Sequence, residues 1–175
     1  MTTLIGYDTE FLNLGSTLYP ISIGLAFSTG IHYYAVNKDM PVRAIGANDF
    51  LMEHVWPQLP LDKNGNLDYR NTVVKSLGRI AEEIKGLLEA EENGWELVTY
   101  CGSQDGTIFG NLFSKGMWPE GWGWWVYDIE QERRRLGVEL PEQTTLLHHA
   151  LSDASYNLAC RFWLDDLAAK TQVGR

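Results

Sequence analysis

The chain has 175 residues, of which 45% are hydrophobic and 21% are charged, and this composition excludes a disordered protein. The length predicts one domain that spans residues 1–175. Lys and Arg number 14 against 23 Asp and Glu, so the formal net charge is −9, which argues against nucleic-acid binding through a broad basic surface. A protein that meets phosphates through bound metal ions stays open, because the ions supply positive charge locally.

The cysteines and the first residues bear on the compartment. Cys101 and Cys160 form no CxxC pair or disulfide framework, which predicts a reduced, cytoplasmic setting. Residues 1–10 hold no Lys or Arg and no apolar run, so we expect no signal peptide. The stretch Phe11–Asn37 holds no Asp, Glu, Lys or Arg, but Pro20 and several glycines interrupt it, so it predicts buried strands and no membrane span.

Extended segments dominate the first part of the chain. Leu4–Phe11 predicts a strand that ends in polar side chains. Leu18–Phe27 and Ile31–Val36 are β-branched and aromatic and predict two further strands, joined by a hairpin at Ser28–Gly30. Asn48–Trp56 predicts a short helix that a proline ends.

Helices and strands alternate in the middle of the chain. Trp95–Cys101 and Trp122–Tyr127 predict two more strands, with a helix around Ile108 and Phe109 between them. The clearest helix precedes these strands and is predicted by apolar residues that recur at spacings of 3 and 4, namely Val74, Leu77, Ala81, Ile84 and Leu88.

Two helices complete the predicted fold. A charged helix runs to Gly137, and an amphipathic helix carries an apolar stripe from Leu147 to Phe162. The resulting order, βββ-α-β-α-β-α-α, predicts an α/β fold with a mixed five-stranded sheet flanked by helices.

Asp8-Thr9-Glu10 is the first candidate for chemistry, because it ends the first predicted strand. Residues two apart on a strand point to one face, with Cβ atoms roughly 6–7 Å apart, and two carboxylates that close repel unless cations lie between them. Two acids at a solvated strand end would show the same spacing. Asp128-Ile129-Glu130 repeats the pattern, so the spacing alone decides nothing.

Asp105 and the segment His148–Asp153 are the other candidates. Asp105 follows a strand and opens a helix, where a carboxylate is also a common helix cap. Positions five apart in an ideal helix differ by ~140° in azimuth, so His148 and Asp153 converge only if His148 lies just before the helix. A surface histidine and a surface acid would give the same letters.

Together these motifs form an ordered set: DTEF ends the first strand, an Asp follows a middle strand, and HHALSDA opens the last helix. The set strongly resembles the DEDDh 3′–5′ exonucleases of the DnaQ-like, ribonuclease H-like class, whose pattern is DxE, a central Asp and HxxxxD. The resemblance implies a ribonuclease H-like fold, His148 as general base, and four metal-binding carboxylates, namely Asp8, Glu10, Asp105 and Asp153.

The neighbouring candidates fit this pattern less well. His149 is out of register for the general base. Asp128 fails the order of the motifs, because no Asp lies between Glu130 and His148, and it predicts a cap that opens a helix over Glu130–Leu136.

A narrower resemblance covers most of the chain. The segments YDTEF, PISIG, YYAV and HVWPQLP are similar to the small mycobacterial ribonuclease AS group and its phage relatives. That group degrades RNA from the 3′ end with a bias toward adenylate tails, uses magnesium and is typically dimeric. The resemblance therefore implies an RNA 3′ end as substrate, a homodimer, and the cytoplasm of a bacterial or phage-infected cell. Many DnaQ-like members have an Asn and an aromatic residue where this chain has Cys101 and Gln104.

The implied chemistry uses two Mg²⁺, for which Mn²⁺ can substitute. Two such ions ~3.5–4 Å apart bind the scissile phosphate, one activating the attacking water and one stabilising the leaving oxygen. Histidine titrates near neutral pH, so His148 can take the proton of the water. We expect Thr9 and Phe11 to contact the substrate, Phe11 by stacking on the terminal base, although ordinary core packing explains Phe11 equally well.

Two other functions stay open. A 3′–5′ DNA exonuclease of the same fold would share every motif, because the 2′-OH is read by local contacts that no motif identifies. A non-catalytic ribonuclease H-like module that binds nucleic acid is the second alternative. The four acids with His148 favour the enzyme, because a binding module has no reason to hold carboxylates that repel one another.

Overall fold

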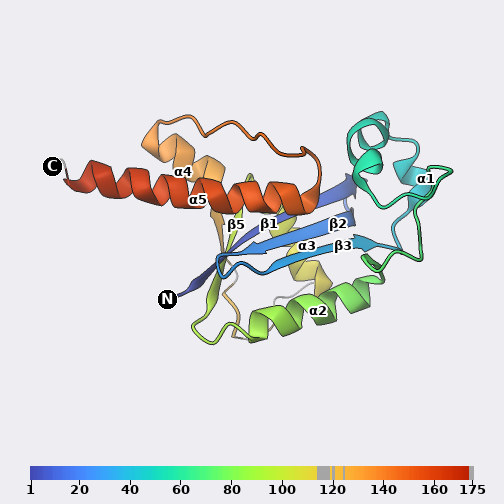
Figure 1. Ribbon diagram of the computed structural model, residues 1–175, viewed down its shortest axis with the longest axis horizontal. Helices are drawn as coiled ribbons and strands as arrows, with labels where there is room; N and C mark the ends of the chain where they lie inside the picture. Colours follow the sequence, from blue (N-terminus) through green and yellow to red (C-terminus); the bar gives the residue numbers. More distant parts are fainter. Residues whose placement is uncertain (114–118, 120, 124, 174–175) are drawn as a thin grey trace.

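The computed structural model describes residues 1–113, 119, 121–123 and 125–173. Over these residues it shows a mixed six-stranded sheet in the order β4-β3-β2-β1-β5-β6, with helices on both faces (Figure 1). The strands are β1 (Thr3–Asn13), β2 (Leu18–Phe27), β3 (His32–Asn37), β4 (Val74–Lys75), β5 (Trp95–Thr99) and β6 (Val126–Asp128). The α-helices are α1 (Val42–Ile45), α2 (Leu77–Glu89), α3 (Ser103–Leu112), α4 (Ile129–Leu136) and α5 (Ala150–Val173). The predicted α/β class is confirmed.

The first three strands form the antiparallel half of the sheet, and the second and third are joined by the predicted hairpin. β1 pairs with β2 from Ile5 to Asn13, and its register shifts between Glu10 and Phe11. β2 pairs with β3 across the predicted hairpin, in which Gly30 adopts a positive φ of 91° that residues with a Cβ rarely adopt. The predicted acidic motif thus lies near the far end of a long, well-paired strand.

β1, β5 and β6 form the parallel half. β5 lies parallel to β1 with Gly6 opposite Val98, so the residues that follow β5 lie beside the end of β1. β6 lies parallel to β5 and covers only the end of the predicted strand Trp122–Tyr127. Within that prediction, Trp124 lies outside the described residues.

A sixth strand corrects the predicted count of five. Val74 and Lys75 form β4, which pairs with β3, and α2 begins only at Leu77. Ser76 is the N-cap, and its hydroxyl accepts a hydrogen bond from the amide of Arg79. The sequence pattern wrongly assigned Val74 to the helix, because it lies three residues before Leu77, which is also a helical spacing. A strand of two residues has no periodicity that would correct this assignment.

The short helix predicted at Asn48–Trp56 differs in its winding. Leu51–Val55 is a π-helix, and a 3₁₀ turn follows at Trp56–Gln58. The π-helix ends at Val55, shortly before Pro57, and Pro57 itself lies inside the 3₁₀ turn. Proline is tolerated there because the first amides of a helix have no intrahelical partner.

Helix α5 covers one face of the sheet, and α2 and α3 cover the other (Figure 1). Side chains alternate along β1, so Ile5 and Tyr7 enter a core that includes Ile84 of α2. Gly6 and Asp8, which alternate with them along the strand, therefore belong to the α5 face. This alternation determines which helix each acidic residue of β1 meets.

Two glycines allow α5 to lie directly on β1 and β2. A Cβ at Gly6 would lie 1.9 Å from the carbonyl oxygen of Ala154, and one at Gly24 would lie 2.3 Å from the carbonyl of Ala150. No side chain fits at either position. Asn157 of α5 adds a hydrogen bond of 3.1 Å from its Nδ2 to the backbone of β1. The backbone of the first turns of α5 is thus positioned by backbone contacts with the strands.

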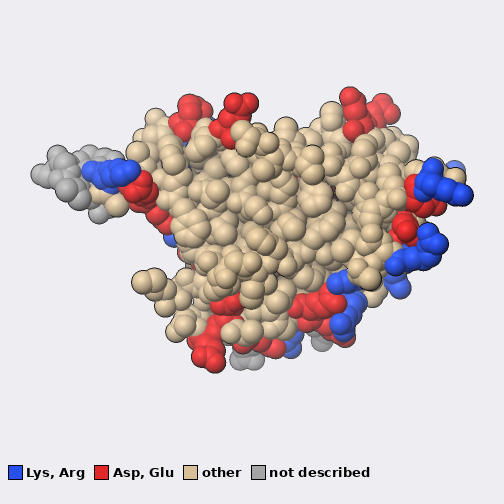
Figure 2. All heavy atoms as spheres, in the orientation of Figure 1, with Lys and Arg blue, Asp and Glu red and all other residues tan. Residues whose placement is uncertain are grey.

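The charged side chains lie mainly around the edge of the face shown in Figure 2, and much of its centre is uncharged. This face agrees with the expectation that the protein has no broad basic surface. Within the described part of the chain, no helix has both the length and the apolar character that crossing a membrane requires.

Candidate active site

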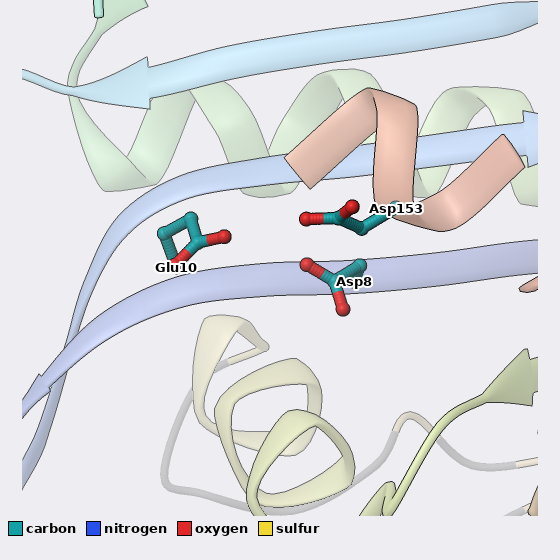
Figure 3. Close-up of side chains that lie close together, drawn as sticks. All are labelled: Asp8, Glu10 and Asp153. Carbon is teal, nitrogen blue, oxygen red and sulfur yellow. The ribbon is translucent and has the colours of Figure 1, made fainter. Parts of the chain in front are cut away.

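Three of the predicted carboxylates converge at the end of β1. Asp8 and Glu10 are two residues apart on β1 and point to the face that α5 covers. Asp153 approaches from the first turn of α5, and the three side chains point toward one another (Figure 3). One carboxylate oxygen from each lies within 4.8 Å of the others. The structure therefore brings together residues that are more than 140 positions apart in the chain.

The start of α5 brings His148 to the same place as Asp153. The helix begins at Ala150, so His148 precedes it, with a positive φ of 60° that is rare for residues with a Cβ. The azimuthal separation of an ideal helix does not apply to a residue outside the helix. This is the condition under which the sequence predicts convergence. Leu147, expected on the apolar stripe, also precedes α5 and is exposed.

Asp105 comes from α3, which packs on the opposite face of the sheet from α5, and its carboxylate is held by Thr9. The Thr9 amide and the Thr9 hydroxyl both donate to Oδ1 of Asp105, at 3.0 and 2.5 Å. The N-cap of α3 is Gly102, so the interpretation of Asp105 as a plain N-cap is wrong. Asp105 is outside the group of three oxygens within 4.8 Å, yet it is buried beside them.

A single open cavity of about 590 Å³ joins these groups. Its walls hold all of the site residues that the sequence predicts, namely Asp8, Thr9, Glu10, Phe11, Asp105, His148 and Asp153. Cys101 and Gln104, the two positions that depart from the family pattern, line it as well. Residues from β1, α3 and the start of α5 therefore face one volume of the size that holds a small ligand.

Burial acts on each of the four predicted carboxylates, and repulsion among them adds to it at Asp8 and Glu10. Burial raises the pKa of Asp8 well above its usual range, and the charges of Asp105 and Glu10 raise it further. Burial, with the charge of Asp153, raises the pKa of Glu10 to about 8. Burial also raises the pKa of Asp153, and it raises that of Asp105 to about 6 against the hydrogen bonds from Thr9. The cavity therefore disfavours four ionised carboxylates unless positive charge enters it.

The donor set fits a divalent cation with oxygen ligands. Mg²⁺ and Mn²⁺ prefer carboxylate oxygens, and the three converging oxygens come from Asp8, Glu10 and Asp153. Bound cations would favour the ionised form of each carboxylate, which burial disfavours. The chemistry of these side chains thus agrees with the metal site that the resemblance implies.

The two adjacent histidines differ in their contacts. The ring of His148 meets Phe50 edge-on at 5.1 Å between centroids and lies 5.5 Å from the ring of His54. The ring of His149 instead stacks on Tyr34 at 4.5 Å. Phe50 and His54 come from the helical segment around the π-helix, which sequence analysis did not connect with the site. Aromatic neighbours so distant in the chain leave no local pattern to read.

Gln143 is a further site residue that the sequence does not indicate. Its Nε2 donates to Oδ1 of Asp153 at 2.5 Å, and its side chain lines the same cavity. It lies in the irregular segment between α4 and α5, where no periodicity predicts the direction of a side chain. Its role depends on the path of that segment across α5.

Asp128 is a helix cap, as predicted. Its carboxylate accepts a hydrogen bond of 3.1 Å from the amide of Gln131 at the start of α4, and one of 2.9 Å from the amide of Gly102. Glu130 pairs with Arg133 and with the arginine that follows it. The second DxE motif of the chain thus stabilises α4 and the turn before α3.

The fold matches a solved structure. Over 93% of its length, the chain is similar to Pop2p from S. pombe in its Mg²⁺ and Mn²⁺ bound form, with a TM-score of 0.53 and 15% sequence identity over 81% of that chain. The protein thus has a ribonuclease H-like α/β fold, as the acidic motifs imply. No model of a known protein family matches the chain.

Particular relatives are found in Mycobacterium tuberculosis. Two proteins, from two strains and each named 3′-5′ exoribonuclease, are 41% identical to the chain over 54 residues. The match spans 31% of the chain and 31% of each relative, so the chain matches less than a third of their length. This partial match to proteins named 3′-5′ exoribonuclease agrees with the resemblance to the 3′–5′ exonucleases that the acidic motifs carry.

Proposed function

We propose that the protein is a metal-dependent 3′–5′ exoribonuclease that releases nucleoside 5′-monophosphates from single-stranded RNA. The convergence of Asp8, Glu10 and Asp153, in a cavity that Asp105 and His148 also line, carries this proposal. The fold shared with a Mg²⁺ and Mn²⁺ bound protein and the partial match to proteins named 3′-5′ exoribonuclease support it.

The proposed cofactor is a pair of Mg²⁺ ions, for which Mn²⁺ can substitute. Asp8, Glu10, Asp105 and Asp153 would hold the ions. When bound, the ions would neutralise charge on the scissile phosphate and lower the pKa of the attacking water.

The other residues of the cavity act on the substrate and on protons. His148 would accept the proton of the attacking water as general base. Phe11 is half-buried and lines the cavity, so its ring would stack on the terminal base. Thr9 stays a proposed substrate contact. Its two hydrogen bonds to Asp105 give it an additional role, which is to orient that carboxylate.

We propose RNA rather than DNA as the substrate, because the matched relatives are named exoribonucleases. An adenylate-rich 3′ tail as substrate, a homodimer, a single catalytic domain and a cytoplasmic location follow from the sequence resemblance alone and stay predictions. A non-catalytic module is disfavoured, because it gains nothing from buried carboxylates whose pKa values are raised.

A labelled-oligonucleotide assay tests the proposal. With Mg²⁺ or Mn²⁺, 5′-labelled single-stranded RNA should shorten stepwise, a blocked 3′ end should protect it, and EDTA should stop the reaction. DNA of the same sequence should be degraded more slowly. Internal cleavage, or full activity in EDTA, would contradict the proposal, and equal or faster DNA cleavage would favour the DNA exonuclease.

Substitution of the two histidines tests the assignment of the general base. His148→Ala should lower turnover by the ~10²–10⁴ typical of a lost general base and keep most metal binding. His149→Ala should lower turnover much less, because its ring stacks on Tyr34. A deeper loss of turnover in His149→Ala would show that His148 is not the base.

A further inference from the structure

The segment between α4 and α5, residues 138–149, crosses α5 beside the acidic residues. Two of the hydrogen bonds that tether it to that helix lie on either side of Gln143 in the chain. The Tyr156 hydroxyl donates to the carbonyl of Pro141 at 2.7 Å, and the Ser152 hydroxyl donates to Oγ1 of Thr145 at 2.8 Å. Gln143 is midway between the tethered residues, two positions from each. Its backbone is therefore held at a fixed place against the first turns of α5.

The amide of Gln143 is directed at Asp153. Its Nε2 lies 2.5 Å from Oδ1 of Asp153, 3.3 Å from Oγ1 of Thr145 and 3.4 Å from the carbonyl oxygen of Leu146. An amide nitrogen has two hydrogens, so the shortest contact takes one and the two longer contacts compete for the other. The bond to Asp153 is thus the principal interaction of this side chain.

We propose that Gln143 is a positioning residue for the metal ligand Asp153. A hydrogen bond to one carboxylate oxygen fixes the rotation of the group and leaves the second oxygen free to face Asp8 and Glu10. Partners of this kind orient metal ligands in many proteins, and their loss lowers metal affinity. This inference rests on the proposed function, since it needs a cation at the acidic trio.

The neutrality of the amide matters for this role. A lysine at position 143 would pair with Asp153 as a cation and would compete directly with the metal for that carboxylate. An aliphatic side chain would remove this donor, and Asp153 would keep only its backbone hydrogen bonds from His148 and His149. Glutamine donates a hydrogen bond without adding charge to the cavity, so it restrains the carboxylate and leaves its charge available.

A purely structural role would be that Gln143 only ties the segment to α5. The two roles differ in what they change. A structural tie lowers the melting temperature of the metal-free protein and leaves the affinity for metal intact. A positioning residue alters metal affinity even where the metal-free fold is kept. The tethers at Pro141 and Thr145 already bind the segment to α5, so loss of Gln143 should leave the segment in place.

The test measures Mn²⁺ binding to the purified protein by titration calorimetry, with melting of the metal-free protein as a second readout. Gln143→Met keeps the length of the side chain without the donor and should raise the Kd for Mn²⁺ by about 10- to 100-fold. Gln143→Lys should raise it at least as much. Thr144→Val, an exposed neighbour, is the matched control and should bind like the wild type.

The outcomes separate the two proposals. If the wild type binds no Mn²⁺, the proposed function fails. If the wild type binds Mn²⁺ and Gln143→Met binds it equally well, the role of Gln143 is overturned and the proposed function stands. If Gln143→Met melts too low to titrate, Gln143→Ala, which also lacks the donor and adds no charge, decides: a raised Kd supports the role, and an unchanged Kd overturns it.

Discussion

At the end of β1, the carboxylates on the two faces of the sheet are held in different ways. On the α5 face, Asp8, Glu10 and Asp153 place oxygens within 4.8 Å of one another, and burial raises the pKa of each. On the α3 face, Asp105 is buried and accepts two hydrogen bonds from Thr9. On the α5 face the carboxylates lie close to one another, whereas on the α3 face hydrogen bonds from Thr9 stabilise the carboxylate.

This difference separates two ways of preparing a metal ligand. Asp105 is oriented before any cation arrives, because the amide and the hydroxyl of Thr9 bind the same oxygen. On the α5 face, the contact of the α5 backbone with Gly6 and Gly24 positions the helix that carries Asp153. The carboxylates there would be stabilised by a bound cation. The α5 face should therefore respond most to added volume and to added metal, and the α3 face to a lost hydrogen bond.

Added volume under α5 should have the largest effect on stability. Gly24→Val places a side chain where the backbone of Ala150 lies 2.3 Å from a Cβ, so α5 must shift and the free energy of unfolding should fall by about 3 kcal/mol. Gly78 of α2 has no atom within 4 Å of such a Cβ, so Gly78→Ala is the control and should raise stability by about 0.5–1 kcal/mol. Urea unfolding measures both, and a stable Gly24→Val would refute the close packing.

Removal of one hydrogen bond should be the next largest effect, on the α3 face. Thr9→Val keeps the shape of the side chain and removes the hydroxyl donor, so buried Asp105 loses one of its two bonds from Thr9. The free energy of unfolding should fall by about 1–3 kcal/mol, and activity should fall with it. Thr9→Ser keeps the hydroxyl and should retain most of both. Equal unfolding curves for Thr9→Val and the wild type would show that Asp105 does not need this partner.

The end of β1 and the start of α5 could be predicted because their residues are local. Asp8 and Glu10 share a face through strand alternation, and His148 meets Asp153 once the helix begins after it. The order along the chain of β1, β2, β3, β5 and β6 could be predicted from runs of hydrophobic residues.

The rest depends on contacts that no local pattern contains. β4 has two residues, and Val74 fits the stripe of the following helix as well as it fits a strand. Gln143 reaches Asp153 only because an irregular segment is tethered across α5. Phe50 reaches His148 from a π-helix, whose winding the sequence does not indicate. Such contacts are determined by the packed structure, which is why the sequence leaves them out.

Removal of one carboxylate charge should change stability by a smaller amount, and by different amounts on the two faces. Without metal, the free energy of unfolding of Asp8→Asn should be about 1 kcal/mol or more higher than that of the wild type, because the buried charge is lost. Asp105→Asn should gain less, since the bonds from Thr9 already offset its burial. Mn²⁺ at ten times its Kd should add about 1.4 kcal/mol to the wild type and less to either variant. Thermal melting with and without Mn²⁺ measures this, and a metal that shifts no curve would contradict a shared site.

The pH dependence of the metal-free protein should distinguish the two faces most finely. An acid whose pKa is higher in the folded protein than in the unfolded chain binds more protons when folded, so stability falls as pH rises between the two values. For Asp105 that window runs from about 4 to about 6, and for Glu10 it runs from about 4.5 to about 8. The slope should be at most about 1.4 kcal/mol per pH unit for each group. Urea unfolding in EDTA from pH 4.5 to pH 8 should show that Glu10→Gln reduces the loss of stability above pH 6, to which Asp8 also contributes, whereas Asp105→Asn reduces the loss mainly below pH 6. If both substitutions flatten the same part of the curve, the two carboxylates titrate as one group and the separation of the faces is wrong.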